Sequence, residues 1–111
     1  MKSLVDNGNA KVLTDSGWVE FRPRQTTIVE VHDCGGVSVI RENYMKFNGS
    51  NVYAIDENLR VVWEAQLPHP SDIFANILVP ADGGFETSTW NGIRCLIDVK
   101  TGMTTKLGIT K

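Results

Sequence analysis

An imidazole, a carboxylate and a thiol fall together at only one place in the chain, His32-Asp33-Cys34. A Cys–His pair can form an activated nucleophile. Successive side chains of a strand point to opposite faces, which separates sequence neighbours, and the following Gly35-Gly36 is typical of a hairpin turn. The pattern favours a structural role. The alternative is a small ligand-binding domain or an enzyme that uses His32, Cys34 or His69 at a pocket.

Metal and phosphate binding are not indicated by the remaining polar residues. A metal site needs three or four ligands that converge, and the soft candidates stand at no recognised ligand spacing: His32, His69, Cys34 and Cys95. The glycine pairs at 35–36 and 83–84 lack the Lys-Ser/Thr that completes a phosphate-binding loop. We expect no metal and no cofactor. Cysteines without CxxC spacing are typical of buried thiols, and whether these two approach in space is open.

Six acidic residues lie between positions 56 and 86, where Arg60 is the only Lys or Arg. Such a run is commonly a solvated surface, but it can also steer a basic partner into contact. Trp90 stands beside the turn Asn91-Gly92 and is either an aromatic contact anchor or a core residue at a strand end. The predicted partner-binding residues are Asp56, Glu57, Glu64, Asp72, Asp82, Glu86 and Trp90.

Length and composition set the broader limits. A chain of 111 residues with 41% apolar and 22% charged residues is typical of one globular domain, here 1–111. The formal charge of −2 and scattered basic residues argue against a nucleic-acid partner. No apolar run is long enough for a membrane span, and the N-terminus lacks the apolar segment of a signal peptide. We expect a cytoplasmic location and no membrane contact.

Turn signals and alternation predict the elements that must position these side chains. The turns Asn91-Gly92 and Thr101-Gly102 divide 85–109 into a three-stranded antiparallel meander. The segment 26–41 reads as a hairpin. Further strands are predicted at 10–13, 18–21, 52–56 and 60–67, whereas 71–79 suits either a short helical turn or a strand. The pattern predicts an all-β domain of about eight short antiparallel strands, arranged as two packed sheets or a small barrel.

An internal repeat links two parts of the chain. Residues 53–56 (Tyr-Ala-Ile-Asp) align with 95–98 (Cys-Leu-Ile-Asp), 42 residues later. In each copy a strand ends in an Asp that can accept turn N–H groups, so Asp56 and Asp98 are predicted turn formers. The segment 52–63 resembles a blade of quinoprotein-type β-propellers, except that Leu59 stands where that pattern has Gly. At most two blades are visible, and no quinone site is implied.

The C-terminal pattern carries a second resemblance. Trp90-Asn91-Gly92, followed by Ile97-Asp98 and Thr101-Gly102, resembles the ending of small bacterial proteins that include immunity proteins of polymorphic toxin and contact-dependent growth-inhibition systems. The resemblance implies a non-enzymatic protein that binds a cognate protein toxin, for instance a nuclease, and occludes its active site. A third hypothesis is a subunit that adds strands or blades to a larger assembly. The oligomeric state is open.

Overall fold

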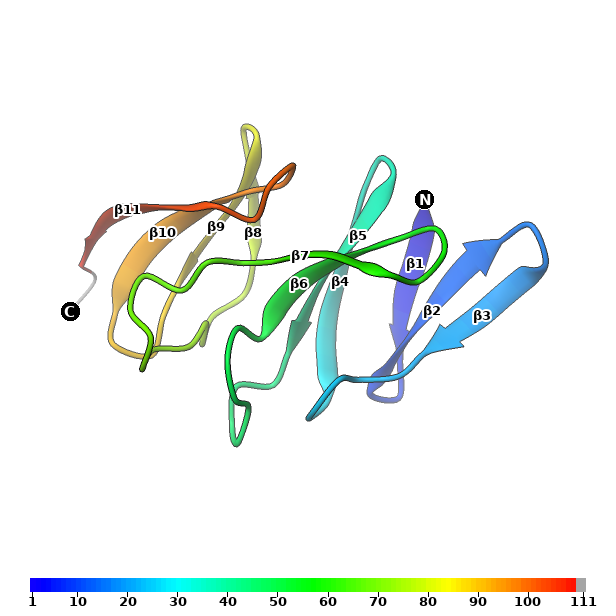
Figure 1. Ribbon diagram of the computed structural model, residues 1–111, viewed down its shortest axis with the longest axis horizontal. Helices are drawn as coiled ribbons and strands as arrows, with labels where there is room; N and C mark the ends of the chain where they lie inside the picture. The colour runs from blue at the N-terminus through cyan, green and yellow to red at the C-terminus, as the bar shows by residue number, and fades with distance from the viewer. Residues whose placement is uncertain (110–111) are drawn as a thin grey trace.

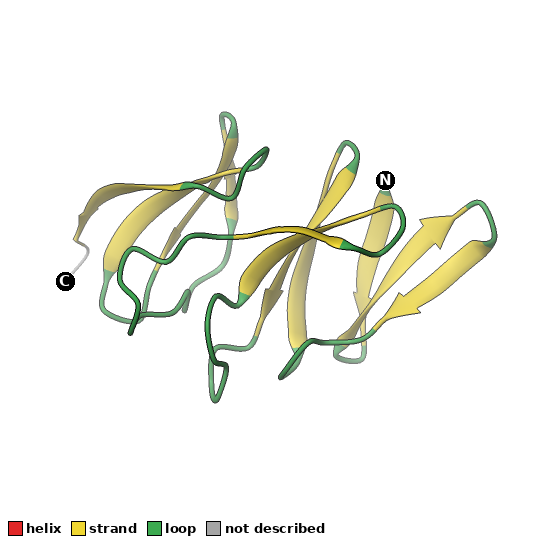
Figure 2. Ribbon diagram, in the orientation of Figure 1, coloured by secondary structure: helices red, strands yellow, loops and turns green. Residues whose placement is uncertain are grey.

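The computed structural model describes residues 1–109, which form eleven β-strands in three antiparallel sheets and no helix (Figures 1 and 2). The predicted all-β, antiparallel fold is confirmed. The chain exceeds the expected eight strands partly through two short strands. Lys2–Asp6 was not predicted, and Val79–Ala81 overlaps the ambiguous segment 71–79 only at Val79. Each of these two strands forms an edge, the former of the first sheet and the latter of the third. The described residues contain no helix that could cross a membrane.

The first sheet is a three-stranded meander of β1 (Lys2–Asp6), β2 (Asn9–Thr14) and β3 (Gly17–Phe21). Asn7 and Gly8 take φ angles of 54° and 85°. These are the positive values that a tight hairpin turn requires, and Asn and Gly accept them most readily. Alternation then places Ala10 and Val12 of β2 in the interior, whereas Leu13 is exposed.

The middle sheet has the order β4-β5-β6-β7, with β4 (Ile28–Cys34), β5 (Val37–Glu42), β6 (Val52–Asp56) and β7 (Val61–Glu64). The predicted hairpin is β4–β5, closed by Gly35-Gly36. Four consecutive residues of β6, Val52 to Ile55, have no exposed surface. A strand is buried on both sides only when both faces of its sheet are covered, so this is the central layer.

The third sheet has the order β11-β10-β9-β8, with β8 (Val79–Ala81), β9 (Gly84–Ser88), β10 (Ile93–Asp98) and β11 (Thr104–Ile109). Strands β9 to β11 confirm the predicted meander. Pro80 lies in β8, which is an edge strand, the position in a sheet where a residue without an N–H donor is tolerated.

The three sheets lie in a row along the long axis, with β1–β3 at one end and β8–β11 at the other (Figure 1). Two hydrophobic cores separate them. The first core joins Ala10 and Val12 to Tyr53 and Ile55 of the middle sheet. The second core joins the opposite face of the middle sheet to the third sheet, and contains Val39, Val52, Ala54, Phe74, Phe85, Cys95 and Ile97.

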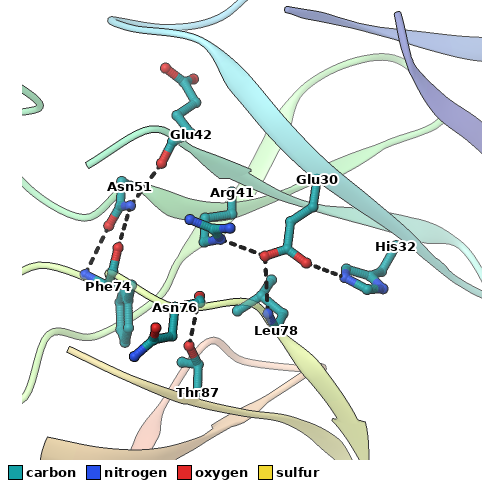
Figure 3. A network of polar contacts seen from close by, with 9 residues as sticks. All are labelled: Glu30, His32, Arg41, Glu42, Asn51, Phe74, Asn76, Leu78 and Thr87. Carbon is teal, nitrogen blue, oxygen red and sulfur yellow. Dashed lines mark hydrogen bonds and ion pairs between the residues drawn. The ribbon is translucent and has the colours of Figure 1, made fainter. Parts of the chain in front are cut away.

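Residues 71–78 form neither a helix nor a strand, although a single β-bridge joins Phe74 to Thr89. The buried side chain of Asn51 fixes this segment in place. Its Nδ2 donates to the carbonyl oxygen of Phe74 at 2.8 Å, and its Oδ1 accepts from the Phe74 N–H at 3.1 Å (Figure 3). The conformation therefore depends on a residue 23 positions away, which a local pattern cannot reveal.

The repeated turns use their Asp residues as predicted. Asp56 Oδ1 accepts from the N–H of Asn58 at 2.9 Å, and Asp98 Oδ1 accepts from the N–H of Lys100 at 2.7 Å. In the first of these turns the sequence suggests Asn58 as the left-handed residue. It is instead Leu59 that has a φ of 63°, at the position where the blade pattern has Gly.

Candidate functional site

His32 and Cys34 line one open cleft of about 300 Å³ between β4 and the β8–β9 turn. They stand two residues apart on β4, so their side chains share a face. Strand alternation separates adjacent residues such as Asp33 and Cys34, but it places His32 and Cys34 together. Across the cleft lie Pro80, Gly83 and Phe85. The structure therefore brings together two of the three candidates for nucleophilic chemistry.

The hydrogen bond of His32 is made with Glu30 rather than with the thiol. Nε2 of His32 lies 2.8 Å from Glu30 Oε2, and the imidazole packs against Phe85 with ring centroids 4.9 Å apart. The other carboxylate oxygen of Glu30 accepts from Arg41 and from the Leu78 N–H (Figure 3). His32 is thus one member of a network that joins the middle sheet to the segment before β8.

Cys34 is poorly suited to act as a nucleophile. Burial, followed by the nearby charge of Asp33, raises the pKa of its thiol, and the thiolate is the reactive form. The Asp33 carboxylate is engaged by the N–H of Ser3 at 3.1 Å and by the hydroxyl of Ser38 at 3.3 Å. Cys95 is buried, and burial raises its pKa to about 11. Both cysteines are free thiols in contact with the second core.

His69 does not join His32. Its Nδ1 accepts from the N–H and the hydroxyl of Ser71, at 3.2 and 2.8 Å, in an exposed loop. Within residues 1–109 no group of three His, Cys, Asp or Glu side chains could hold a metal ion.

The acidic residues of the predicted partner surface are spread over several elements. Asp56 is occupied by its turn, and Glu57 lines a polar cleft of about 560 Å³ beside the β2–β3 turn. Glu64 forms an ion pair with Arg24 at 3.0 Å. Asp82 lies in the β8–β9 turn, whereas Glu86 lies on the outer face of the third sheet. These side chains do not form one acidic patch.

Asp72 and Trp90 are the two predicted residues that the structure brings together. Asp72 Oδ1 accepts from the N–H of Ile73 at 2.8 Å and of Asn91 at 3.3 Å, which holds the Asn91-Gly92 turn against the preceding loop. Burial raises the pKa of this carboxyl, but the Thr89 side chain and the Ile73 and Asn91 N–H groups outweigh burial and lower it. Asp72 Oδ2 is buried, and no donor within residues 1–109 meets it at hydrogen-bond distance and angle.

Trp90 is 64% exposed, so the interpretation as a core residue at a strand end is wrong. Its indole packs against the ring of Tyr44, with centroids 5.4 Å apart. The Trp90 N–H donates to the Ile73 carbonyl oxygen at 2.9 Å, which fixes the backbone beneath the ring. Met45, next to Tyr44, is also largely exposed. We call Tyr44 and Trp90 the aromatic patch. Tyr44 was not predictable as a contact residue, because its segment of the sequence has no periodicity.

A protein-family model described as a domain of unknown function (DUF7957) matches residues 2–109. Neither a curated protein nor a solved structure matches the chain. The family match spans all eleven strands, both clefts and the aromatic patch. The chain belongs to the DUF7957 family of domains of unknown function.

Proposed function

We propose that this chain is a non-enzymatic protein-binding domain, namely a bacterial immunity protein that acts in the cytoplasm and neutralises a cognate toxin by occluding its active site. The observation that carries the binding role is the exposed Trp90, whose ring packs against Tyr44 and whose backbone N–H is hydrogen-bonded to Ile73. The assignment to a toxin rests on the resemblance of the C-terminal pattern to immunity proteins.

The aromatic patch has the properties of a binding hot spot. A large exposed ring that is already held in one orientation loses little conformational freedom when a partner covers it. Tyr and Trp are enriched among the residues that dominate binding energy at interfaces. The buried Asp72 carboxylate supports the turn from behind, so that the ring and its backbone form one rigid unit.

The acidic side chains have a different role in this proposal. Since Glu57, Asp82 and Glu86 are exposed on separate elements, they act through the overall negative field rather than through one contact. Such a field accelerates encounter with a cationic toxin domain, such as a nuclease, and is screened by salt.

The test uses the toxin domain encoded next to the gene of this protein. Titration at low salt is expected to show tight association that weakens as salt is added. Trp90→Ala should raise the dissociation constant by about 30-fold or more, as for a hot-spot residue. The control is Met103→Ala, which removes another exposed side chain from the β10–β11 turn and should bind normally. Absence of binding by the wild-type chain at low salt would sink the proposal.

A second candidate function is a small ligand-binding domain or enzyme, and the cleft that contains His32 and Cys34 favours it. Iodoacetamide labelling of the native protein separates this candidate from the first. Because burial raises the pKa of both thiols, we expect slow labelling at pH 7 that becomes fast only after denaturation. Rapid labelling of native Cys34 at pH 7 would favour the enzyme.

A further inference from the structure

The spacing of 42 residues holds for three sheets rather than two. Thr14, Asp56 and Asp98 stand at this spacing, and each ends the last-but-one strand of its sheet, namely β2, β6 and β10. Thr14 Oγ1 accepts from the N–H of Ser16 at 3.2 Å, which corresponds to the Asp56–Asn58 and Asp98–Lys100 bonds. A Thr in place of Asp conceals this first copy from a comparison of sequence letters.

Equivalent positions face the same way in every sheet. Val12 faces the middle sheet through the first core, and Ala54, its counterpart, faces the third sheet through the second core. The next counterpart, Leu96, lies on the outer face of the third sheet, which no other sheet within residues 1–109 covers. The repeat therefore provides, at the end of the row, a packing face that has no partner sheet in the described part of the chain.

The opposite faces obey the same rule. Ile97 faces the middle sheet, and Ile55 faces the first sheet. Their counterpart Leu13 points out of the other end of the row and is exposed beside Trp18, its direct neighbour across β2 and β3. Leu4 of β1 is exposed on the same side. We call Leu4, Leu13 and Trp18 the leading face.

The outer face of the third sheet also carries exposed apolar side chains. They line a shallow groove of about 340 Å³ together with Glu86 and Arg94. We call this outer face the trailing face. Its exposed apolar side chains are Ile77, Val79 and Leu107, and the half-buried Leu96 lies on the same face outside the groove. Clustered exposed apolar residues on a sheet face indicate an interaction surface more strongly than scattered ones.

We propose that the trailing face of one chain packs against the leading face of a second copy, and that two copies close into a ring of six sheets. The proposal follows from the repeat, because the trailing face is equivalent to the face of the middle sheet that already packs against a sheet of this kind. The two faces lie at opposite ends of the row, so one copy cannot join its own ends (Figure 1).

The number of copies follows from closure. A head-to-tail contact generates a closed ring when its rotation closes, and rings of radially packed antiparallel sheets typically hold about four to eight sheets. Two chains supply six sheets, whereas three chains would exceed this range. Charges also permit the contact, because each face carries both signs. Lys11 and Glu20 lie on the leading face, and Glu86 and Arg94 lie on the trailing face.

Sedimentation equilibrium of the full chain tests the proposal, with an expected mass twice the 12.3 kDa of one copy. Trp18→Glu on the leading face and Leu107→Glu on the trailing face should each weaken the dimer by about a hundredfold or more, because an unpaired charge is then buried. The control Met103→Glu, outside both faces, should leave the dimer intact. Far-UV circular dichroism identifies any variant that fails to fold.

A mixing experiment tests the head-to-tail geometry. When the Trp18→Glu and Leu107→Glu chains are combined, one contact of the ring joins two unaltered faces, so we expect dimers to reappear. A dimer that pairs two leading faces would not recover in this way. A monomeric mass up to the solubility limit, a trimeric mass, or a dimer that neither substitution weakens would overturn the proposal.

Discussion

Glu42 is the most heavily hydrogen-bonded carboxylate in the described part of the chain. It has no exposed surface, and it accepts from the N–H groups of Arg24 at 2.7 Å, Gln25 at 3.0 Å and Thr26 at 2.9 Å. The Tyr53 hydroxyl donates to it at 2.5 Å. One buried side chain thereby fixes the segment that connects the first sheet to the middle sheet.

The ionised form of Glu42 is favoured by these donors. Burial by itself raises the pKa of this carboxyl, but the hydrogen bonds from Thr26, Tyr53, Arg24 and Gln25 outweigh burial and lower the pKa below its ordinary value. Burial and the adjacent Glu42 raise the pKa of Tyr53, so its hydroxyl stays protonated and continues to donate.

Substitution of Glu42 should reduce stability in a pH-dependent way. Because its pKa is lower in the folded state than in the unfolded state, Glu42 stabilises the fold above the unfolded pKa of about 4.3. This contribution is lost as the pH falls through the folded pKa. Glu42→Gln removes it and places an N–H₂ group among donors, so we expect a loss of about 2–4 kcal/mol at pH 7. Urea denaturation should show this difference shrinking in acid.

The exposed Glu57→Gln is the matched control and should change stability little at any pH. A destabilisation by Glu42→Gln that is equal at pH 7 and in acid would contradict the role assigned to its charge.

The role of a single residue could be predicted from the sequence only where its hydrogen-bond partners are close to it along the chain. Asp56 and Asp98 each act within four residues of themselves, and their turn role was predictable. The donors to Glu42 come from up to 18 positions away, so no sequence pattern singles out this residue. The exposure of Trp90 likewise depends on a packing arrangement with Tyr44 that lies outside any local motif.

At the scale of elements, the turn between β10 and β11 attaches the third sheet to β7. Trp63 Nε1 donates to the Val99 carbonyl oxygen at 3.0 Å, and the Gln66 N–H donates to the Gly102 carbonyl oxygen at 2.8 Å. Gly102 has a φ of 76°, and a Cβ there would lie 2.6 Å from the Trp63 ring. Only glycine allows this close approach of the two elements.

Two glycine substitutions separate backbone strain from the packing of these elements. Gly35 has a φ of 65°, but a Cβ at that position would meet no atom within 4 Å. Gly35→Ala should therefore cost about 1–2 kcal/mol, the strain of a left-handed Ala. Gly102→Ala carries this strain and the overlap with Trp63, so we expect about 1–3 kcal/mol more. Chemical denaturation measures both losses of stability. Equal losses would contradict the prediction, because they would show that the turn shifts away from Trp63 at no cost in free energy.

Strands that are bounded by local turn residues could be predicted from the sequence, whereas strands that depend on distant pairing could not. Strands β9 to β11 are separated by turns that positive-φ glycines define, including Gly92 and Gly102, and the meander was predictable. By contrast, β1 has only Leu4 and Val5 as apolar residues and is recognised through its pairing with β2. The segment 71–79 was ambiguous because its course depends on partners far away in the sequence, such as Asn51 and Glu30.

At the scale of the whole molecule, β6 belongs to both hydrophobic cores. Val52 and Ala54 contribute to the second core, and Tyr53 and Ile55 contribute to the first. Neither core can lose this strand without exposing the other. Because the two cores share one backbone segment, we expect the three sheets to unfold together.

The three tryptophans allow this cooperativity to be measured. Trp18 lies in the first sheet, Trp63 in the middle sheet, and Trp90 just after β9 of the third. Variants with a single tryptophan, the others replaced by Phe, should each show a fluorescence transition that coincides with their far-UV circular dichroism. Ile55→Ala and Ile97→Ala, one in each core, should each cost about 2–5 kcal/mol and shift every probe equally.

An early transition of the Trp18 probe alone would instead identify the first sheet as an independent unit. Met103→Ala, which truncates an exposed side chain outside both packing faces, serves as the control and should leave all three transitions nearly unchanged.

The all-β class was predictable from alternation and turn chemistry, whereas the number of sheets was not. Strand Asp residues reveal two copies of the repeat, but Thr14 occupies the equivalent position in the first sheet. Only the backbone geometry and the direction of Val12 and Leu13 identify the third copy. Assembly of sheets into a row is decided by long-range packing that composition does not encode.

The constant spacing of Thr14, Asp56 and Asp98 has a consequence for how such a gene can change in length. Insertion or deletion of a single residue within a strand turns every following side chain of that strand to the wrong face of the sheet. Duplication or loss of a whole 42-residue unit preserves all of these directions, because the unit spans one complete sheet with its connections and leaves every strand intact. The coding sequence can therefore grow or shrink by whole sheets, and tandem duplication of the gene would produce a single polypeptide with both sets of packing faces.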